Sequence, residues 1–437
     1  MTLRPQMRIQ SVRKHASARS ERAVPVEETL ARAGPCAAAL GVTRLANITG
    51  LDRLGIPVFT AVVPKSDDSI SVYNGKGIHR DESKAGALME AIERQTALDT
   101  RLPVVMASFR AMRRGKRAAV DPRSFNQKLR AGYREDRASL WTEAHDLIHG
   151  EVVMVPAAMV AYGTRYAHPG SPFATSSSNG LASGNCFEEA VCHGLCELVE
   201  RDAFTLAQLR SQWIPKARRE AVLGAGAPGA DDPDACPRID LAGAGDPFPL
   251  LLEKFERAGL RLVVRDITSD IGIPSAVAST ADDTVPGFPQ AHGGMGAHPN
   301  ARIAVIRAIT ELAQSRVVDI QGAREDIVAA HETAPEGNRL TQRVHKIEPG
   351  RWLFQQTGRT RRFRQMASVQ NDDIADDIRL ILARLARHGI ERVLVVDLSG
   401  PDGFAVVRVM APGLEFWALD GERIGPRALA FWRRHVA

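Results

Sequence analysis

The sequence predicts a fold of the α/β or α+β class, in which helices and strands alternate along the chain. Short apolar runs rich in β-branched residues, bounded by glycine and proline, are typical of buried strands. Longer segments with apolar residues at helical spacing separate these runs. The 437 residues are 44% apolar and 25% charged, which is typical of a globular protein with a substantial core.

Each predicted element rests on a local pattern. The run GIPVFTAVVP at 55–64 predicts a buried strand. ISVYNGKG at 70–77 predicts a strand that enters a glycine turn, and 81–100 predicts a helix with Asp81 or Ser83 near its cap. The other predicted elements are a strand at 151–160, a helix at 186–210, a helix and strand over 252–268, a strand at 273–280, a helix at 300–323, a helix and strand over 376–400 and a strand at 404–417.

The domain organisation follows from local composition. Residues 1–24 are basic and polar without apolar periodicity, so we expect a flexible N-terminal segment or an arm over the body. Residues 25–437 are expected to form a single domain. Glycine, alanine, proline and aspartate dominate 218–247, which predicts a surface loop or insertion.

Bulk charge and cysteine content exclude several classes of protein. The net charge of +6 is modest, and no apolar run of about 18 residues occurs, so we predict neither a nucleic-acid nor a membrane partner. Basic clusters at 109–117 and 359–365 could meet an acidic partner, although a solvated face is the favoured interpretation. Five cysteines in so long a chain do not indicate a disulfide framework, so we expect a cytoplasmic protein.

Two of the predicted helices carry the same motif, E-x-x-E-R. Each copy begins 13 residues after a glycine, Gly77 or Gly184, and a degenerate third copy has Glu311 and Gln314 at the acid positions. Such quasi-repeats are typical of pseudo-symmetric units around one site. The motif residues are Glu90, Glu93 and Arg94 in the first helix and Glu197, Glu200 and Arg201 in the second.

The spacing of these acids determines what they could do. Residues three apart share a helix face, and Glu189 lies 11 residues before Glu200, three turns away on nearly the same face. Carboxylates that converge in this way suit Mg²⁺ bound to a triphosphate, with the arginines neutralising phosphate or supporting the acids. A single motif would more simply be a surface pair, but its duplication after matched glycines favours a site.

Other motifs carry weaker signals. The sequence lacks a Walker A loop, so any nucleotide is bound without one. HGGMGAH at 292–298 predicts a turn near the site rather than a metal centre. Cys192, His193 and Cys196 lie on the second acid helix and could ligate a metal or carry sulfur, but burial of small thiols in the core is the favoured interpretation.

With these residues in hand, the chain resembles the YcaO family of ATP-dependent enzymes, which activate a peptide-backbone amide. The matching motifs are NGKG-x12-E-x-x-E-R and SNGLASGN-x3-EA-x6-E-x-x-ERDA, and the likeness extends over about residues 22–425. The resemblance implies an α+β fold with pseudo-symmetric helix-on-sheet units around a central nucleotide site and mixed or antiparallel sheets. It implies ATP and Mg²⁺ as cofactors.

The resemblance also implies roles for individual residues. Ala182 stands where some members have a serine. The implied Mg²⁺ ligands are Glu90, Glu93, Glu197 and Glu200, which together with Arg201 are the predicted catalytic residues. The implied cofactor-binding residues are Arg22, Thr29, Asn185, Glu189, Arg201 and Arg307.

The implied reaction is phosphorylation of an amide oxygen. A nucleophile adds to the amide carbon, the oxyanion takes the γ-phosphoryl group of ATP, and phosphate leaves with the former amide oxygen. The segments 42–58, 410–415 and 421–437 resemble the subgroup encoded with a TfuA partner, which is associated with thioamidation by external sulfide.

The resemblance implies several partners: a peptide or protein substrate, a TfuA-like protein, a separate leader-peptide recognition protein and a second copy of the chain in a homodimer. Two alternative functions stay open. One is an azoline-forming cyclodehydratase that acts on Cys, Ser or Thr. The other is a non-catalytic scaffold that binds ATP and assists another enzyme.

Overall fold

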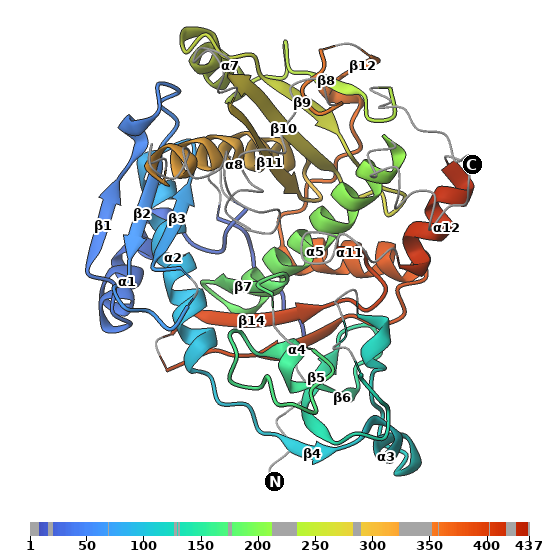
Figure 1. Cartoon of the computed structure of the whole chain (residues 1–437). Helices are drawn as coiled ribbons and strands as arrows, with labels where there is room; N and C mark the ends of the chain where they lie inside the picture. Colours follow the sequence, from blue (N-terminus) through green and yellow to red (C-terminus); the bar gives the residue numbers. More distant parts are fainter. Residues whose placement is uncertain are drawn as a thin grey trace, which may run out of the picture.

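In the computed structural model, the described residues form three β-sheets and the helices that pack on them (Figure 1). None of the helices in the described parts of the chain is long and apolar enough to cross a membrane. The structure describes residues 8–15, 21–68, 70–125, 129, 132–173, 177–211, 234–282, 290–322, 352–356, 358–401, 403–416 and 425–435.

The first sheet is antiparallel, with strand order β1-β2-β3. Its strands are β1 (Arg44–Asn47), β2 (Val58–Val62) and β3 (Val72–Lys76). Helix α2 (Arg80–Asp99) packs against the sheet, and α1 (Val26–Ala39) packs against α2. Side chains of both helices and of β2 and β3 form one apolar cluster, which fixes α2 on the sheet.

The second sheet has the order β11-β10-β9-β8-β12, and only β8 and β12 are parallel. The helices α7 (Phe248–Arg257) and α8 (Ala301–Gly322) supply nine of the 19 buried residues of the apolar cluster on one face. The strands are β8 (Arg238–Asp240), β9 (Val263–Asp266), β10 (Ser275–Asp282), β11 (Gln290–Ala297) and β12 (Thr360–Arg362).

The third sheet has the antiparallel order β4-β5-β13-β14-β7, and β6 pairs with β5. Helices α5 (Phe187–Arg210) and α11 (Ile374–Arg387) bury their apolar faces on it. The strands are β4 (Val105–Ala107), β5 (Ser139–Asp146), β6 (Val152–Pro156), β7 (Leu181–Gly184), β13 (Leu394–Asp397) and β14 (Ala405–Met410), and the shorter helices are α3 (Phe109–Arg114), α4 (Ala157–Val160) and α12 (Pro426–His435).

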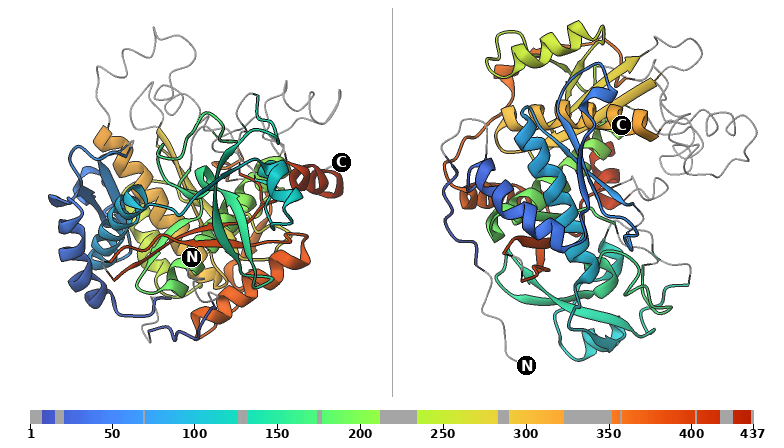
Figure 2. Two further views of the ribbon diagram at one scale, coloured as in Figure 1. Left: turned by 90° about the horizontal axis from the view of Figure 1, so that it is seen from below. Right: turned by 90° about the vertical axis from the view of Figure 1, so that its left-hand side faces the viewer.

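Helix α5 is the central element of the molecule. Its N-terminal half packs on β7 and β14 of the third sheet, and its C-terminal half packs against β10 and β11 of the second. Figures 1 and 2 show α5 between these two sheets, with α2 and α8 beside it. The mixed and antiparallel sheets confirm the predicted α+β class.

Several predicted elements need correction. The HGGMGAH segment is not a turn but the end of strand β11, and the strand predicted at 404–417 ends at Met410. Of the loop predicted at 218–247, residues 218–233 lie outside the described residues, and the rest contains strand β8. Proline ends the strand predicted at 151–160, since β6 stops at Pro156 and α4 follows.

The N-terminal arm, residues 8–15, lies in extended conformation against α11 and the start of α5. Ile374 donates its backbone N–H to the carbonyl of Val12 at 2.9 Å. The Gln10 N–H donates to a carboxylate oxygen of Glu188 at 2.9 Å. Lys14 is buried and pairs with two carboxylates at the junction with α11. The remaining residues of the segment before residue 21 lie outside the described residues.

Candidate active site

Three strand–helix units meet at the site: β3 with α2, β7 with α5, and β11 with α8 (Figure 1). In each unit a glycine on the strand lets the helix backbone pack directly on it. A Cβ on Gly75 would lie 1.9 Å from the Ser83 carbonyl oxygen, and one on Gly296 would lie 2.1 Å from that of Ala304. The glycine-rich sequence of β11 is therefore a packing requirement of α8 rather than a turn signal.

The first acid of each unit accepts a backbone N–H from its own strand or from the residue just before that strand. Glu90 accepts the backbone N–H of Asn74 at 2.9 Å, and Glu197 accepts that of Gly180 at 3.3 Å. Glu311 accepts a backbone N–H from Met295 in the same way. The degenerate third motif thus keeps the geometry of the other two, as a structural repeat should.

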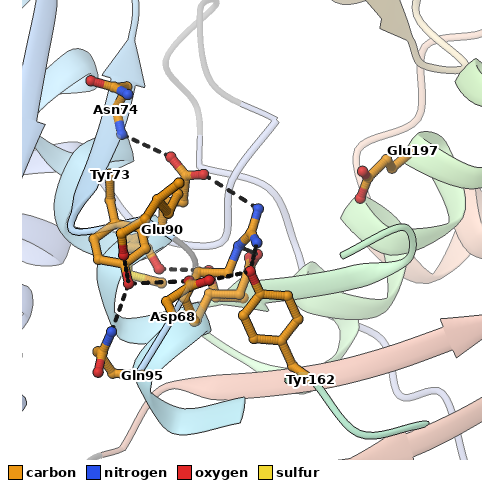
Figure 3. A network of polar contacts seen from close by, with 12 residues as sticks. Asp68, Tyr73, Asn74, Glu90, Gln95, Tyr162 and Glu197 are labelled. Carbon is orange, nitrogen blue, oxygen red and sulfur yellow. Dashed lines mark hydrogen bonds and ion pairs between the residues drawn. The ribbon is translucent and has the colours of Figure 1, made fainter. Parts of the chain in front are cut away.

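The carboxylates of the two complete motifs lie within electrostatic range of one another. Burial, opposed by Arg94 and reinforced by Glu90 and Glu197, raises the pKa of Glu93 to about 8. Burial likewise raises the pKa of Glu200 to about 7, with Arg201 opposing the change. Figure 3 shows Glu197 approaching from the side opposite Glu90. The structure therefore brings together the acids that the repeat predicted.

The two acids of each motif differ in exposure. The side chains of Glu90 and Glu197 are 29% and 23% exposed, whereas those of Glu93 and Glu200 are each 10% exposed. Burial also raises the pKa of Glu90 and of Glu197. The first acid of each pair therefore faces solvent and the second lies behind it.

The arginines of the motifs support their own acids. Arg94 lies 3.6 Å from Glu90 and 3.8 Å from Glu93, and Arg201 lies 3.4 Å from Glu200 and 3.8 Å from Glu197. Each arginine thus faces two carboxylates and cannot neutralise both. The deficit of positive charge is what a divalent cation would fill, because buried carboxylates need a charged partner.

The spacing of the carboxylates indicates how a cation would be held. Among the residues that the structure describes, no three carboxylates of the two motifs come within 4.8 Å of one another. Mg²⁺ usually binds only one or two protein carboxylates directly and completes its shell with water and phosphate oxygens. The residues present therefore fit Mg²⁺ that is shared with a nucleotide, rather than a cage made of protein alone.

A polar network behind Arg94 holds the first motif in place (Figure 3). Arg94 donates to the Tyr162 hydroxyl, and its guanidinium lies 4.8 Å from the centroid of that ring. Tyr162 donates to Asp68 at 2.8 Å, and the Tyr73 hydroxyl donates to the other oxygen of Asp68 at 3.2 Å. No sequence motif predicted these residues, because they come from separate parts of the chain.

Four of the predicted cofactor-binding residues form a second cluster at the start of α5. Arg22 donates to Glu189 at 2.9 Å, and the Asn185 side-chain amide donates to the same carboxylate at 3.0 Å. The Thr29 hydroxyl donates to the amide oxygen of Asn185 at 3.1 Å. Glu189 precedes Glu200 by three helical turns, about 16 Å. The structure thus places this cluster and the acid site along one face of α5.

Arg307 and His193 lie between the two clusters. Arg307 of α8 donates to the carbonyl of Ala297 at 3.4 Å. Burial, reinforced by the charges of Arg307, Arg22 and Lys76, lowers the pKa of His193 well below its usual value. His193 is therefore neutral at pH 7, and the surrounding positive charge suits an anionic ligand.

The thiols on α5 do not form a convincing metal site. Sulfur atoms of Cys192 and Cys196 lie within 4.8 Å of a ring nitrogen of His298. However, the Asn300 backbone N–H donates to His298 Nδ1 at 3.0 Å, so the neutral ring keeps its proton on Nε2 and offers no free lone pair. Both thiols are buried in the core, as the favoured interpretation expected.

The chain matches one family model and several proteins of known sequence. A family model described as YcaO cyclodehydratase, ATP- and Mg²⁺-binding, matches residues 74–415. An uncharacterized protein of Methanothermobacter thermautotrophicus is 37% identical over 409 residues, 93% of this chain and 98% of that one. A protein from the tfuA 3′ region of Rhizobium leguminosarum bv. trifolii is 35% identical over 404 residues, 90% of this chain and 89% of that one.

Solved structures share the fold. A heterocyclase in complex with substrate and cofactor superposes with a TM-score of 0.73 at 23% identity over 94% of this chain, which spans 55% of that protein. YcaO from Methanopyrus kandleri, bound with AMPPCP and Mg²⁺, gives a TM-score of 0.65 at 24% identity over 92% of this chain and 95% of that one.

The fold is that of solved YcaO structures, and the matching family model describes an ATP- and Mg²⁺-binding family. The chain belongs to the YcaO family, as its motifs predicted. The predicted cofactors, ATP and Mg²⁺, are those of the family.

Proposed function

We propose that this protein uses ATP to phosphorylate the oxygen of a peptide-backbone amide, and that external sulfide then replaces that oxygen to give a thioamide. The relative from the tfuA 3′ region supports the proposal, because it is 35% identical over 90% of this chain. The segments 42–58, 410–415 and 421–437 resemble the same TfuA-associated subgroup. The amide oxygen leaves on phosphate and sulfur takes its place, so the products are the thioamide, ADP and phosphate.

In this proposal the acid site holds the metal. Glu90 and Glu93 from α2 and Glu197 and Glu200 from α5 provide the ligands, with no more than two of these carboxylates bound to any one Mg²⁺ ion. Bound Mg²⁺ supplies positive charge for the phosphoryl group in transfer. Glu93 and Glu200, with pKa values of about 8 and about 7, lose their protons on taking up the cation, so binding releases protons near pH 7.

The remaining cofactor-binding residues orient the nucleotide. Arg22, Thr29, Asn185 and Glu189 form the connected cluster at the start of α5, and we assign them to one end of ATP. Arg307 lies between that cluster and the acids, where its charge would face the phosphates. Arg201 is 25% exposed beside Glu200, so its guanidinium can also reach a phosphoryl oxygen. The protein then works by positioning and electrostatics.

A second candidate function is azoline formation. It is favoured by the description of the family as cyclodehydratase and by the fold shared with a heterocyclase. Here a Cys, Ser or Thr side chain of the substrate is the nucleophile in place of sulfide. Both functions share the phosphorylated intermediate, and they differ only in the atom that attacks the amide carbon.

Mass spectrometry separates these possibilities. The protein is incubated with its TfuA-like partner, a peptide encoded beside it, ATP and Mg²⁺, with and without sulfide. Thioamidation adds the mass difference between sulfur and oxygen only when sulfide is present, whereas azoline formation removes one water without sulfide. Absence of peptide-dependent phosphate release would favour a non-catalytic scaffold and contradict the proposal.

The proposed partners follow from the reaction. A TfuA-like protein is expected to deliver sulfide, and a separate protein is expected to recognise the leader peptide. The microcin synthetase McbBCD, which shares the fold at a TM-score of 0.54, is described as a complex with pro-MccB17 bound. We expect this chain to act as a homodimer with such partners, which size-exclusion chromatography with light scattering would test.

A further inference from the structure

Arg408 is a buried arginine on β14 whose hydrogen bonds reach one chain segment beside each half of the acid site. Its side chain is 1% exposed and lies in the sheet opposite Leu181 of β7. Nε donates to the carbonyl of Val160 at 3.0 Å, and Nη1 donates to the carbonyl of Asn179 at 3.0 Å. Because the buried guanidinium donates to a carbonyl in each of two loops, it fixes both loops relative to β14.

One of these contacts reaches Glu197 through a single peptide plane. The carbonyl of Asn179 accepts from Arg408, and the N–H of the same peptide unit, which belongs to Gly180, donates to Glu197 at 3.3 Å. Rotating this peptide would break both hydrogen bonds together. Gly180 has φ +76°, and a Cβ there would lie 2.1 Å from the Val409 carbonyl oxygen, so the loop is pressed against β14.

The other contact supports the first motif. Val160, whose carbonyl accepts from Arg408, ends α4 two residues before Tyr162. The Tyr162 hydroxyl accepts from Arg94, which faces Glu90 and Glu93. Arg408 is therefore connected through hydrogen bonds and short chain segments to the acids of α2 as well as to Glu197 of α5.

The positive charge of Arg408 also lies near acids of both motifs. Burial lowers its pKa to about 10, so it remains a cation at pH 7, and Glu197 and Glu93 are its acidic neighbours. Its Nη2 is buried without a hydrogen-bond partner among the described residues. The charge is thus kept close to the acids without forming an ion pair that would compete for their oxygens.

We propose that Arg408 is a positioning residue that orients Glu197 through the Asn179–Gly180 peptide and holds the two acid helices ready for a metal-bound nucleotide. The inference rests on the proposed role of Glu197 as a ligand. Residues that orient metal ligands typically contribute 10- to 100-fold to metal affinity or activity. Arg408 is therefore expected to act on metal affinity, although it touches neither metal nor substrate.

The test measures Mn²⁺ binding by electron paramagnetic resonance in the presence of AMPPCP. Arg408→Lys keeps the charge but cannot serve both carbonyls, and it is expected to weaken Mn²⁺ binding about 10- to 100-fold. Arg265→Lys is the matched control, because Arg265 is also wholly buried on a strand and donates to the carbonyls of Cys236 and Gln355. The control is expected to lose stability but bind Mn²⁺ as the wild type does.

A double-mutant cycle shows whether Arg408 acts through Glu197. In a Glu197→Gln background, Arg408→Lys is expected to cause little further loss of Mn²⁺ affinity. Fully additive losses, or equal losses in the Arg408 and Arg265 variants, would overturn the inference. If Arg408→Lys does not fold, Arg408→Gln, which keeps one side-chain N–H₂ donor, takes its place. No peptide is used, so a failed thioamidation assay leaves this result independent.

Discussion

Glu93→Gln is expected to stabilise the metal-free protein while strongly reducing the stabilisation that Mg²⁺ and ATP provide. The side chain of Glu93 is 10% exposed, and burial raises its pKa from 4.5 to about 8. The folded protein therefore holds a proton on Glu93 that the unfolded chain has released. Glutamine has nearly the same shape and no charge to desolvate, so the substitution removes this penalty.

The sign and size of the effect follow from proton linkage. Between pH 4.5 and 8 the folded state binds more protons at Glu93, so the free energy of unfolding falls as pH rises through this window. The free energy of unfolding falls by about 1.4 kcal/mol for each pH unit above 4.5, so burial of Glu93 lowers it by about 3 kcal/mol at pH 7. Below pH 4.5 wild type and variant are expected to be equally stable, and above pH 8 the difference stops growing.

The assay is denaturant unfolding in EDTA at pH 4.5, 7 and 8.5. The exposed Glu143 of β5 supplies the control, because Glu143→Gln is expected to change stability little at any pH. Added Mg²⁺ and ATP should raise the unfolding midpoint of the wild type far more than that of Glu93→Gln. If Glu93→Gln lowers the free energy of unfolding at pH 8.5 in EDTA, the argument that desolvation of the Glu93 carboxylate destabilises the metal-free protein is wrong.

Three further predictions concern the acids, the nucleotide cluster and the packing glycines. Glu90→Gln and Glu200→Gln are expected to abolish peptide-dependent ATP turnover while circular dichroism shows a folded protein; full turnover in both would contradict the metal-site assignment. Glu189→Gln weakens the hold on Arg22 and should reduce ATP affinity about tenfold by calorimetry, whereas unchanged affinity would separate this cluster from the nucleotide. Gly75→Ala places a carbon 1.9 Å from the Ser83 carbonyl oxygen and should lower the free energy of unfolding by about 3 kcal/mol. Gly34→Ala in α1, where an added Cβ has nothing within 4 Å, should raise that free energy by up to about 1 kcal/mol. Equal effects of the two substitutions in a denaturant titration would refute the packing argument.

The acid helices could be predicted because their signal is local. The E-x-x-E-R spacing determines which side chains share a face of α2 or α5, and the preceding glycines reveal the repeat. The same periodicity placed Glu189 on the face of Glu200. Helix boundaries were therefore close, with 81–100 expected and Arg80–Asp99 found.

The rest of the site depends on contacts between distant parts of the chain. Tyr162 lies 68 residues from Arg94 in sequence, and the Arg408 contact to Asn179 spans 229 residues. No spacing rule connects such residues, and an arginine within an apolar strand resembles any other interruption of the pattern. The turn predicted at 292–298 was wrong for a related reason, because close approach of α8, not a turn, requires Gly294 and Gly296 in β11.

The acid of the third repeat, Glu311, differs from those of the first two repeats because a lysine of the protein already pairs with it. Burial alone would raise the pKa of Glu311, but Lys76 and Arg201 lower it below its usual value. Lys76, from the first unit, forms the ion pair with Glu311 at 2.5 Å. Glu311 is therefore ionised without a metal, whereas burial prevails at Glu93 and Glu200 and raises their pKa values. Among the acids of the three repeats, those that burial leaves short of positive charge are therefore on α2 and α5, the two helices proposed to hold the metal-bound nucleotide.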